Sequence, residues 1–405
     1  MLRSVHIAFL FIFATALAVA QPDLGTGADG ALVVSSSTVI NAATTLATST
    51  HSAGTTTIDV ADTTGFSAGD EILIVTVFDD FGAPPMGTAG VYELNEIQSV
   101  GVGTLTLVNP LANGIDGGFV TVDVQVVEVK QYTSVTVTSG GTLRPAAFGG
   151  VADPTGGILA LRCTGTVDVQ SGGAIVADSD GHLGGGTTGT ANPGQQGDSF
   201  AFPGSLFDTS ANDGGGGAGD SGATSGSGGG GGGYGSNGSN GAIAGGATPG
   251  TGGASHGSTD LAELYLGSGG GSGGGGLLGA GGFGGDGGGI VFIVAQAITV
   301  AGDLGANGEL GGFSGFSSLA GGGGGGSGGS VHLTAYDLNV SNSVRAVGGS
   351  PGGGDNANGG GGGVGRIRVN HVNPIVGLAN INPAPFTEQI AGQPVTAVGG
   401  FELYR

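Results

Sequence analysis

Runs of glycine fill much of the second half of the chain, and they limit the folds that are open to it. Of the 405 residues, 98 are glycine. Glycine loses more conformational freedom on folding than any other residue, and such a content often accompanies disorder. However, hydrophobic residues make up 38% of the chain and gather into short β-type runs between the glycine tracts. We therefore expect an ordered, all-β protein.

A repeated pattern occupies residues 153–385. In each copy a glycine run is followed by an apolar strand, a second strand, a short turn and a third short strand. The copies start near Ile158, Ile290, Val331 and Ile367. Stacked copies can bury an apolar face that a single copy cannot. The expected fold of this part is a glycine-rich β-solenoid similar to a parallel β-helix, with consecutive antiparallel hairpins as the alternative.

A long glycine-rich insert, residues 184–289, separates the first two copies and admits two structures. One is a compact, loop-rich tract or a flexible loop. The other is a set of extended helices with three residues per turn, packed side by side through glycine as in collagen. Glycine recurs at every third position over 276–288 and over 232–241, and apolar Leu277 and Phe283 are embedded in the insert. The loop-rich tract is the preferred interpretation, and packed helices are the alternative.

Residues 53–152 form a separate N-terminal β domain in this interpretation. Short runs of alternating apolar and polar residues, such as Val120–Val129, have the period of half-buried strands. Many short strands separated by turn residues are typical of a small sandwich or barrel. Residues 21–52 are polar and weakly patterned, which indicates a linker with one strand near Ala31–Val39, and residues 386–405 are expected to be a C-terminal tail.

The N-terminus indicates export. Arg3 and His6 precede an apolar run that ends in Ala18-Val19-Ala20, which is the pattern of a secretory signal peptide over residues 1–20. The apolar run is too short for a comfortable membrane span. The expected location is therefore extracellular or at the cell surface, with no membrane span after signal cleavage.

The charge of the chain limits which classes of partner it can bind. The formal net charge is −22, from 30 acidic and 8 basic residues, and such a chain repels the phosphate backbone of nucleic acids. Cys163 is the single cysteine, so there is no internal disulfide framework. Because Cys163 lies in an apolar run, we expect a small buried residue.

Four carboxylates are candidate metal ligands. Asp178 and Asp180 lie in a turn after a predicted strand, and Asp79 and Asp80 lie in a similar turn. Hard cations such as calcium take several oxygen ligands from such loops. The later bidentate Glu of a full calcium loop is missing, and a plain polar turn is the alternative. No other cofactor is indicated.

Four aromatic residues in or near the glycine tracts are candidate ligand contacts: Tyr234, Phe283, Phe313 and Phe316. Exposed rings on loops often carry binding functions, and ring faces can stack on sugars. The alternative is that these rings fill small cores between glycine segments.

A family resemblance rests on three strings, Thr64–Ile74, Tyr92–Leu94 and Gly156–Leu161. They resemble segments of large bacterial surface proteins with glycine-rich β-helix repeats, which are adhesin-like and exported. The resemblance implies an architecture and carries no catalytic residues over.

These features predict a secreted, non-enzymatic surface or matrix protein that adheres to a cell surface or binds polysaccharide. No catalytic residue is assigned. One alternative is a β-helix enzyme that degrades polysaccharide, in which paired carboxylates meet in space. The other alternative is a structural subunit that associates with itself.

Overall fold

In a computed structural model of the protein, the chain is described over residues 22–79, 89–117, 122–201, 204, 207–315 and 319–390. Within these ranges it consists of β-strands and extended glycine-rich segments, with two short 3-10 turns at Gly150–Ala152 and Leu378–Asn380. In the same ranges, no helix is long and apolar enough to cross a membrane. The predicted signal peptide, residues 1–20, lies outside them.

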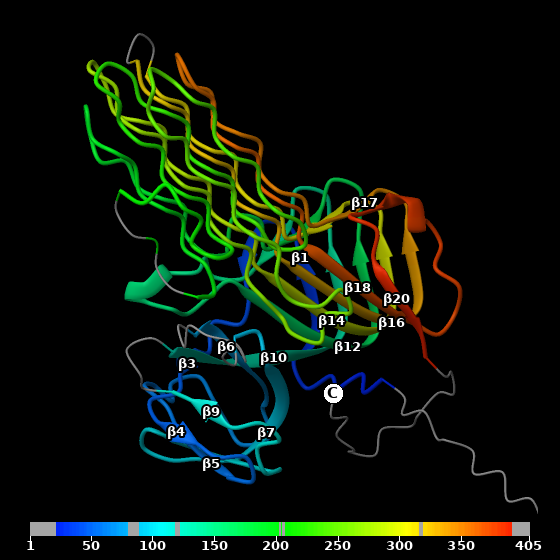
Figure 1. Ribbon diagram of the computed structural model, residues 1–405. Coiled ribbons are helices and arrows are strands. Elements are labelled where there is room, and N and C mark those ends of the chain that lie inside the picture. Colours follow the sequence, from blue (N-terminus) through cyan, green and yellow to red (C-terminus); the bar gives the residue numbers. More distant parts are fainter. Residues whose placement is uncertain are drawn as a thin grey trace, which may run out of the picture.

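Two parallel sheets form the walls of a β-solenoid (Figure 1). Each long strand of sheet A is followed by a short strand of sheet B, and the chain then returns to sheet A one coil further on. In spatial order, sheet A contains β1 (Gly30–Val34), β10 (Val122–Val137), β12 (Ile158–Val169), β14 (Ile290–Val300), β16 (Ser330–Val340), β18 (Arg366–His371) and β20 (Phe386–Gln389). Sheet B contains β2 (Ser37–Val39), β11 (Thr142–Arg144), β13 (Ala174–Val176), β15 (Asp303–Gly305), β17 (Ser343–Arg345) and β19 (Ile381–Asn382). The parallel pairing confirms the predicted solenoid and excludes the antiparallel hairpins.

The core of the solenoid is a set of apolar columns between the two sheets. Successive residues of a strand point to opposite faces, so the same position of each coil is buried. One column on sheet B is formed by the central residues of four strands and by the first residue of β19, which are Leu143, Ile175, Leu304, Val344 and Ile381. Each of these side chains is buried. This stacking explains why the sequence repeats: one coil alone would leave its apolar row in water.

The solenoid begins and ends outside the predicted boundaries. Residues 21–52 are not a linker, because β1 pairs with β10 and β2 with β11, and together they form the first coil. The start of the expected C-terminal tail is also ordered, because β20 pairs with β18. Residues 391–405 lie outside the described ranges.

The N-terminal β unit is antiparallel and shares a strand with the solenoid. It contains β3 (Thr44–Leu46), β4 (Thr50–His51), β5 (Thr57–Asp59), β6 (Glu71–Asp79), β7 (Tyr92–Val100), β8 (Thr104–Leu107) and β9 (Ile115–Asp116) around its own apolar core. The first half of β10 pairs antiparallel with β3 and β6, and its second half pairs parallel with β1 and β12. One continuous strand therefore joins the two parts.

A buried ion pair also fastens the N-terminal unit to sheet A. Arg162 on β12 donates to both carboxylate oxygens of Glu71, at 2.6 and 2.9 Å from Nε. Their side chains are 5% and 7% exposed. A bidentate pair in this setting fixes the relative position of the two parts.

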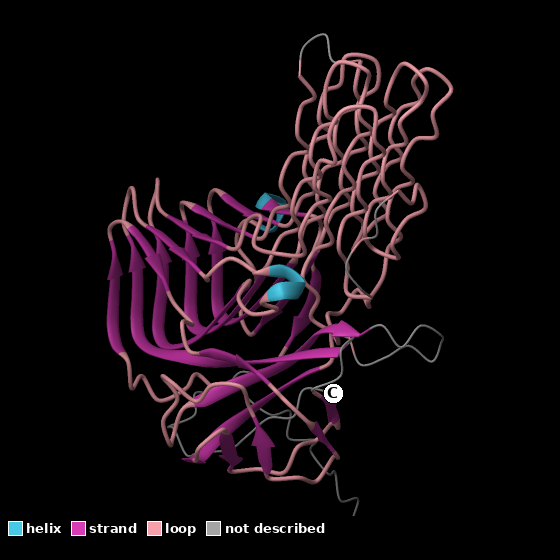
Figure 2. Cartoon of the chain, turned by 90° about the vertical axis from the view of Figure 1, so that its left-hand side faces the viewer, coloured by secondary structure: helices cyan, strands magenta, loops and turns pink. Residues whose placement is uncertain are grey.

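Long glycine-rich excursions project from the third side of the solenoid and pack into one bundle (Figure 2). In their described residues they are neither α-helices nor strands. Gly229, Gly230 and Gly231 donate backbone hydrogen bonds to three different neighbouring segments, and Gly232 returns to the segment that Gly229 reached. This three-residue period is that of an extended helix with three residues per turn.

The bundle corrects the preferred interpretation of the insert in favour of its alternative. The described segments of the insert hydrogen-bond to one another, and they pack with two further excursions, within 306–329 and 346–365, that belong to later coils. The segments 226–235, 266–276 and 320–329 hydrogen-bond to one another, so they form the centre. At this centre nearly every residue is Gly or Ser, because each side of the segment faces another backbone.

Candidate functional site

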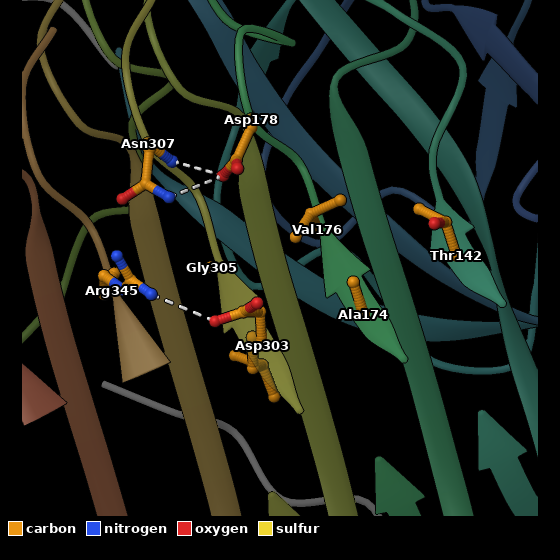
Figure 3. A pocket seen from close by; sticks show the side chains of 9 residues that line it. Thr142, Ala174, Val176, Asp178, Asp303, Gly305, Asn307 and Arg345 are labelled. Atoms are coloured by element: carbon orange, nitrogen blue, oxygen red, sulfur yellow. Dashed lines mark hydrogen bonds and ion pairs between the residues drawn. The ribbon is translucent and has the colours of Figure 1, made fainter. Parts of the chain in front are cut away.

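An open groove crosses the outer face of sheet B and encloses about 380 Å³ (Figure 3). Because β11, β13, β15 and β17 are each three residues long and their central residues point into the core, the two flanking residues of each strand point outward. The groove is lined by Thr142, Ala174, Val176, Asp178, Asp303, Leu304, Gly305, Asn307 and Arg345. These residues come from four successive coils.

Small residues make the hollow of the groove. The outward rows that run across the strands are Thr142–Ala174–Asp303 and Val176–Gly305–Arg345. A methyl group at Gly305 would lie 2.6 Å from the carbonyl oxygen of Arg345, so this position accepts no side chain. The floor is therefore apolar and low between taller polar walls.

One wall is the ion pair of Asp303 and Arg345. Arg345 Nη2 lies 3.0 Å from Asp303 Oδ1, which also accepts a hydrogen bond from the Ser343 hydroxyl at 2.6 Å. Both charged side chains are about half exposed, at 53% and 49%. An exposed pair of this kind adds little stability, so its main effect is to hold two planar charged groups at the groove.

The other wall is formed by Asp178 and Asn307. Asp178 Oδ1 accepts hydrogen bonds from the Asn307 backbone at 2.7 Å and from its side-chain Nδ2 at 3.0 Å. Asn307 Oδ1 in turn accepts from the Val347 backbone at 3.0 Å. Asn307 thus links three coils and fixes the direction of the Asp178 carboxylate.

Asp178 and Asp180, the first predicted pair of metal ligands, lie in different surroundings. Ser179 between them has a φ of 57°, and the two carboxylates have different partners, Arg144 for Asp180 and Asn307 for Asp178. Asp180 is 1% exposed and pairs with Arg144 at 2.8 Å. Burial raises the pKa of Asp180, and Arg144 opposes that shift. Among the described residues, no group of three or more His, Cys, Asp or Glu side chains could hold a metal ion.

Of the second predicted pair, only Asp79 lies within the described ranges. Asp79 is the last residue of β6 and is 8% exposed, and its backbone nitrogen donates to the Phe200 carbonyl at 2.8 Å. Asp80 lies outside the described residues.

The structure places the four aromatic residues that were predicted to contact a ligand in different environments. Tyr234 is completely buried, and its hydroxyl lies 2.9 Å from that of Ser330 on β16. It fills a core between the bundle and sheet A, so its assignment as a ligand contact is wrong. Phe283 and Phe313 are exposed, at 46% and 71%, on the bundle. Phe316 lies outside the described residues.

Sequence reasoning missed Asp303, Asn307 and Arg345. Asp303 and Arg345 lie next to buried Leu304 and Val344 in short sheet B strands, and Asn307 follows the end of β15 by two residues. That position in the repeat was the available signal. The insert hides the fact that β13 and β15 are neighbours, because more than a hundred residues separate them in the chain.

Comparisons with known proteins add little. No protein-family model matches the chain, and no curated protein matches it. Among solved structures, it is similar to a tailspike protein of Pseudomonas phage LKA1 (22% identity over 34% of this chain, TM-score 0.18). It is also similar to the tailspike of Acinetobacter baumannii bacteriophage AP22, in complex with A. baumannii capsular saccharide (10% identity over 89% of this chain, TM-score 0.19).

The chain spans 21% of the first tailspike and 58% of the second. TM-scores this low carry no argument about fold or function. The solenoid is established by its own strand pairing, and the groove is described by its own residues.

Proposed function

We propose that the protein is exported and binds polysaccharide without cleaving it, through the groove on sheet B. The proposal is carried by the combination of an apolar floor with planar polar groups at the rim. Sugar rings present C–H faces bordered by hydroxyls, and each hydroxyl both donates and accepts hydrogen bonds. Ala174 and Val176 can pack against the ring face, while Asp178, Asn307 and Arg345 can reach hydroxyls.

The groove also suits a chain-like ligand. It is open, and it runs across strands of successive coils (Figure 3). Neighbouring strands of a sheet lie about 4.8 Å apart, which is on the scale of one pyranose ring. A polysaccharide lying across the coils would thus meet a similar backbone frame at each ring.

Filling the floor of the groove tests this function. Ala174 points outward and is partly exposed, so Ala174→Trp should fill the hollow without entering the core. We expect the affinity of the variant for the glycan to be lower than that of the wild-type protein by about tenfold or more, which corresponds to about 1.4 kcal/mol. Co-sedimentation with cells and insoluble polysaccharides identifies the glycan, and titration calorimetry with its oligosaccharides measures the loss.

Ser37→Trp is the matched control. Ser37 is an exposed, outward residue in the same row on β2, next to Thr142, and it does not line the groove. It should keep wild-type affinity. If both Trp variants bind as well as the wild-type protein, the groove is not the binding site. If no saccharide binds the wild-type protein, the proposed function fails.

Hydrolysis is the second candidate because the groove holds two carboxylates, Asp178 and Asp303. Glycosidases use such pairs, one as acid and one as base or nucleophile. Release of reducing ends from a bound polysaccharide by the wild-type protein, abolished in Asp178→Asn and Asp303→Asn, would favour the enzyme. Binding with no new reducing ends would favour the non-enzymatic function.

A further inference from the structure

The charges of the groove are unbalanced. Asp178 and Asp303 contribute two negative charges, and Arg345 contributes one positive charge that is already paired with Asp303. The nearest further cation on sheet B, Arg144, is paired with buried Asp180. A ligand in the groove therefore meets a net negative charge, centred on Asp178.

Two carboxylate oxygens remain available to a ligand. Both hydrogen bonds to Asp178 reach Oδ1, as Figure 3 shows. The bonds to Asp303 from Ser343, Arg345 and Asn342 also reach Oδ1. Within the described part of the chain, no hydrogen bond reaches Oδ2 of either residue. Each carboxylate is thus held by one oxygen and offers the other.

The rest of the molecule offers little to an anionic glycan. Every Lys and Arg side chain in the described ranges contacts a carboxylate or a backbone carbonyl; these are Lys130, Arg144, Arg162, Arg345, Arg366 and Arg368. The whole chain carries a formal charge of −22. A polymer of uronic acids or sulfated sugars would therefore be repelled on approach, and its anionic groups would meet no free cation in the groove.

We propose that the groove selects glycans that carry free, protonated amino groups, such as polymers of unacetylated hexosamine. This inference rests on the proposed function and names its ligand class. An ammonium group has three donors and no acceptor, which matches the open Oδ2 of Asp178, a carboxylate whose hydrogen bonds from Asn307 both reach Oδ1. The ring face packs on the apolar floor while the ammonium group lies against Asp178.

The test compares three oligosaccharides of equal length by titration calorimetry: a glucosamine hexamer, an N-acetylglucosamine hexamer and a galacturonate hexamer. We expect the glucosamine hexamer to bind about tenfold more tightly than the acetylated one at low salt, since one close charge pair near a protein surface can supply that difference. The galacturonate hexamer should bind weakest. Raising the salt concentration should reduce the difference in affinity between the glucosamine and N-acetylglucosamine hexamers.

Asp178→Asn removes the charge and keeps an oxygen that can accept from Asn307. It should lower the affinity for the glucosamine hexamer to that of the acetylated hexamer and leave the latter unchanged. Asp303→Asn is a second variant that also makes the groove less negative, and it should reduce the preference for the glucosamine hexamer in the same direction. Asp168→Asn is the matched control, because it removes one charge from β12 on sheet A and should not change the preference.

The outcomes separate this inference from the proposed function. Equal affinity for the acetylated and free-amine hexamers, or tighter binding of galacturonate, overturns the inference and leaves saccharide binding intact. Failure of all saccharides to bind overturns both. Poly-L-lysine that binds as tightly as the glucosamine hexamer, or an equal effect of Asp168→Asn and Asp178→Asn, would show bulk charge attraction and overturns the selective site.

Discussion

At the scale of single residues, the least expected feature is a set of neutral histidines in the core. His182 is 1% exposed and lies against Phe78 and Phe148, with ring centroids 4.7 and 5.4 Å away. Neither of its ring nitrogens has a hydrogen-bond partner within the described residues. Burial lowers the pKa of His182 to about 3, and it lowers that of His256 to about 4. Both residues are therefore neutral in the folded protein near pH 7.

This arrangement predicts a loss of stability in mild acid. In the unfolded chain a histidine binds a proton below about pH 6.5, whereas His182 in the folded protein stays neutral down to about pH 3. The free energy of unfolding should therefore fall as the pH drops from 6.5 towards 3. Each such histidine should contribute about 2 kcal/mol of loss at pH 5.

The variant His182→Phe isolates this contribution. It replaces the imidazole with another ring in an aromatic environment, so its free energy of unfolding should depend less on pH than that of the wild-type protein. Urea denaturation at pH 7.5 and pH 5 measures the difference between the two proteins at each pH. A difference that is the same at both pH values would contradict the prediction, whatever the other titrating groups contribute.

At the scale of elements, the glycine-rich segments are defined by close backbone packing. Consecutive glycines of one segment face different surroundings. A methyl group at Gly360 would overlap the carbonyl oxygen of Ser239, and one at Gly362 would overlap that of Gly326. A methyl group at Gly361 would have only ordinary contacts, with the nearest atom, Pro351 Cδ, at 3.6 Å. The three-residue period of the helix produces this difference.

Three alanine variants test the packing. Gly360→Ala and Gly362→Ala should each lower the free energy of unfolding by about 1–3 kcal/mol or more, because the backbones cannot separate without breaking hydrogen bonds. Gly361→Ala should change it by less than about 0.5 kcal/mol. Chemical denaturation gives the three values. Equal losses at all three positions would mean that the segment is not an extended helix with three residues per turn.

The elements also show where sequence reasoning reaches its limit. Apolar alternation and the repeat located β6, β7, β12, β14 and β16, because these strands are defined by local periodicity. The predicted domain boundaries were wrong at β1 and β2, because the burial of these strands depends on pairing with strands about a hundred residues away. The arrangement of the bundle and the position of the groove were not predicted for the same reason. Which glycine segments touch, and which coils bring Asp178 beside Asn307, is decided by contacts that leave no local pattern.

At the scale of the whole molecule, three apolar cores hold the parts together. One lies inside the solenoid, one inside the N-terminal unit, and a third lies between β6, the outer face of sheet A and the bundle. Tyr234 and Tyr265 from the insert belong to this third core, together with Phe292 on β14. The bundle is therefore packed onto the solenoid rather than suspended from it, and it presents the exposed rings of Phe283 and Phe313 from a fixed frame.

The charge of this compact molecule predicts a strong effect of salt on its stability. Packing the chain brings a formal charge of −22 into a smaller volume, and the described cations are already paired with internal groups, so self-repulsion opposes folding. The Debye length falls from about 30 Å at 0.01 M to about 8 Å at 0.15 M salt. We therefore expect the Tm to rise by several degrees between these concentrations and to change less above them.

Calcium chloride at matched ionic strength should give the same Tm as sodium chloride, because the described residues contain no metal-ligand cluster. Thermal unfolding followed by circular dichroism tests both points. A Tm independent of salt would mean that the carboxylates are too far apart to repel, and a further rise specific to calcium would mean that the folded chain does bind the ion.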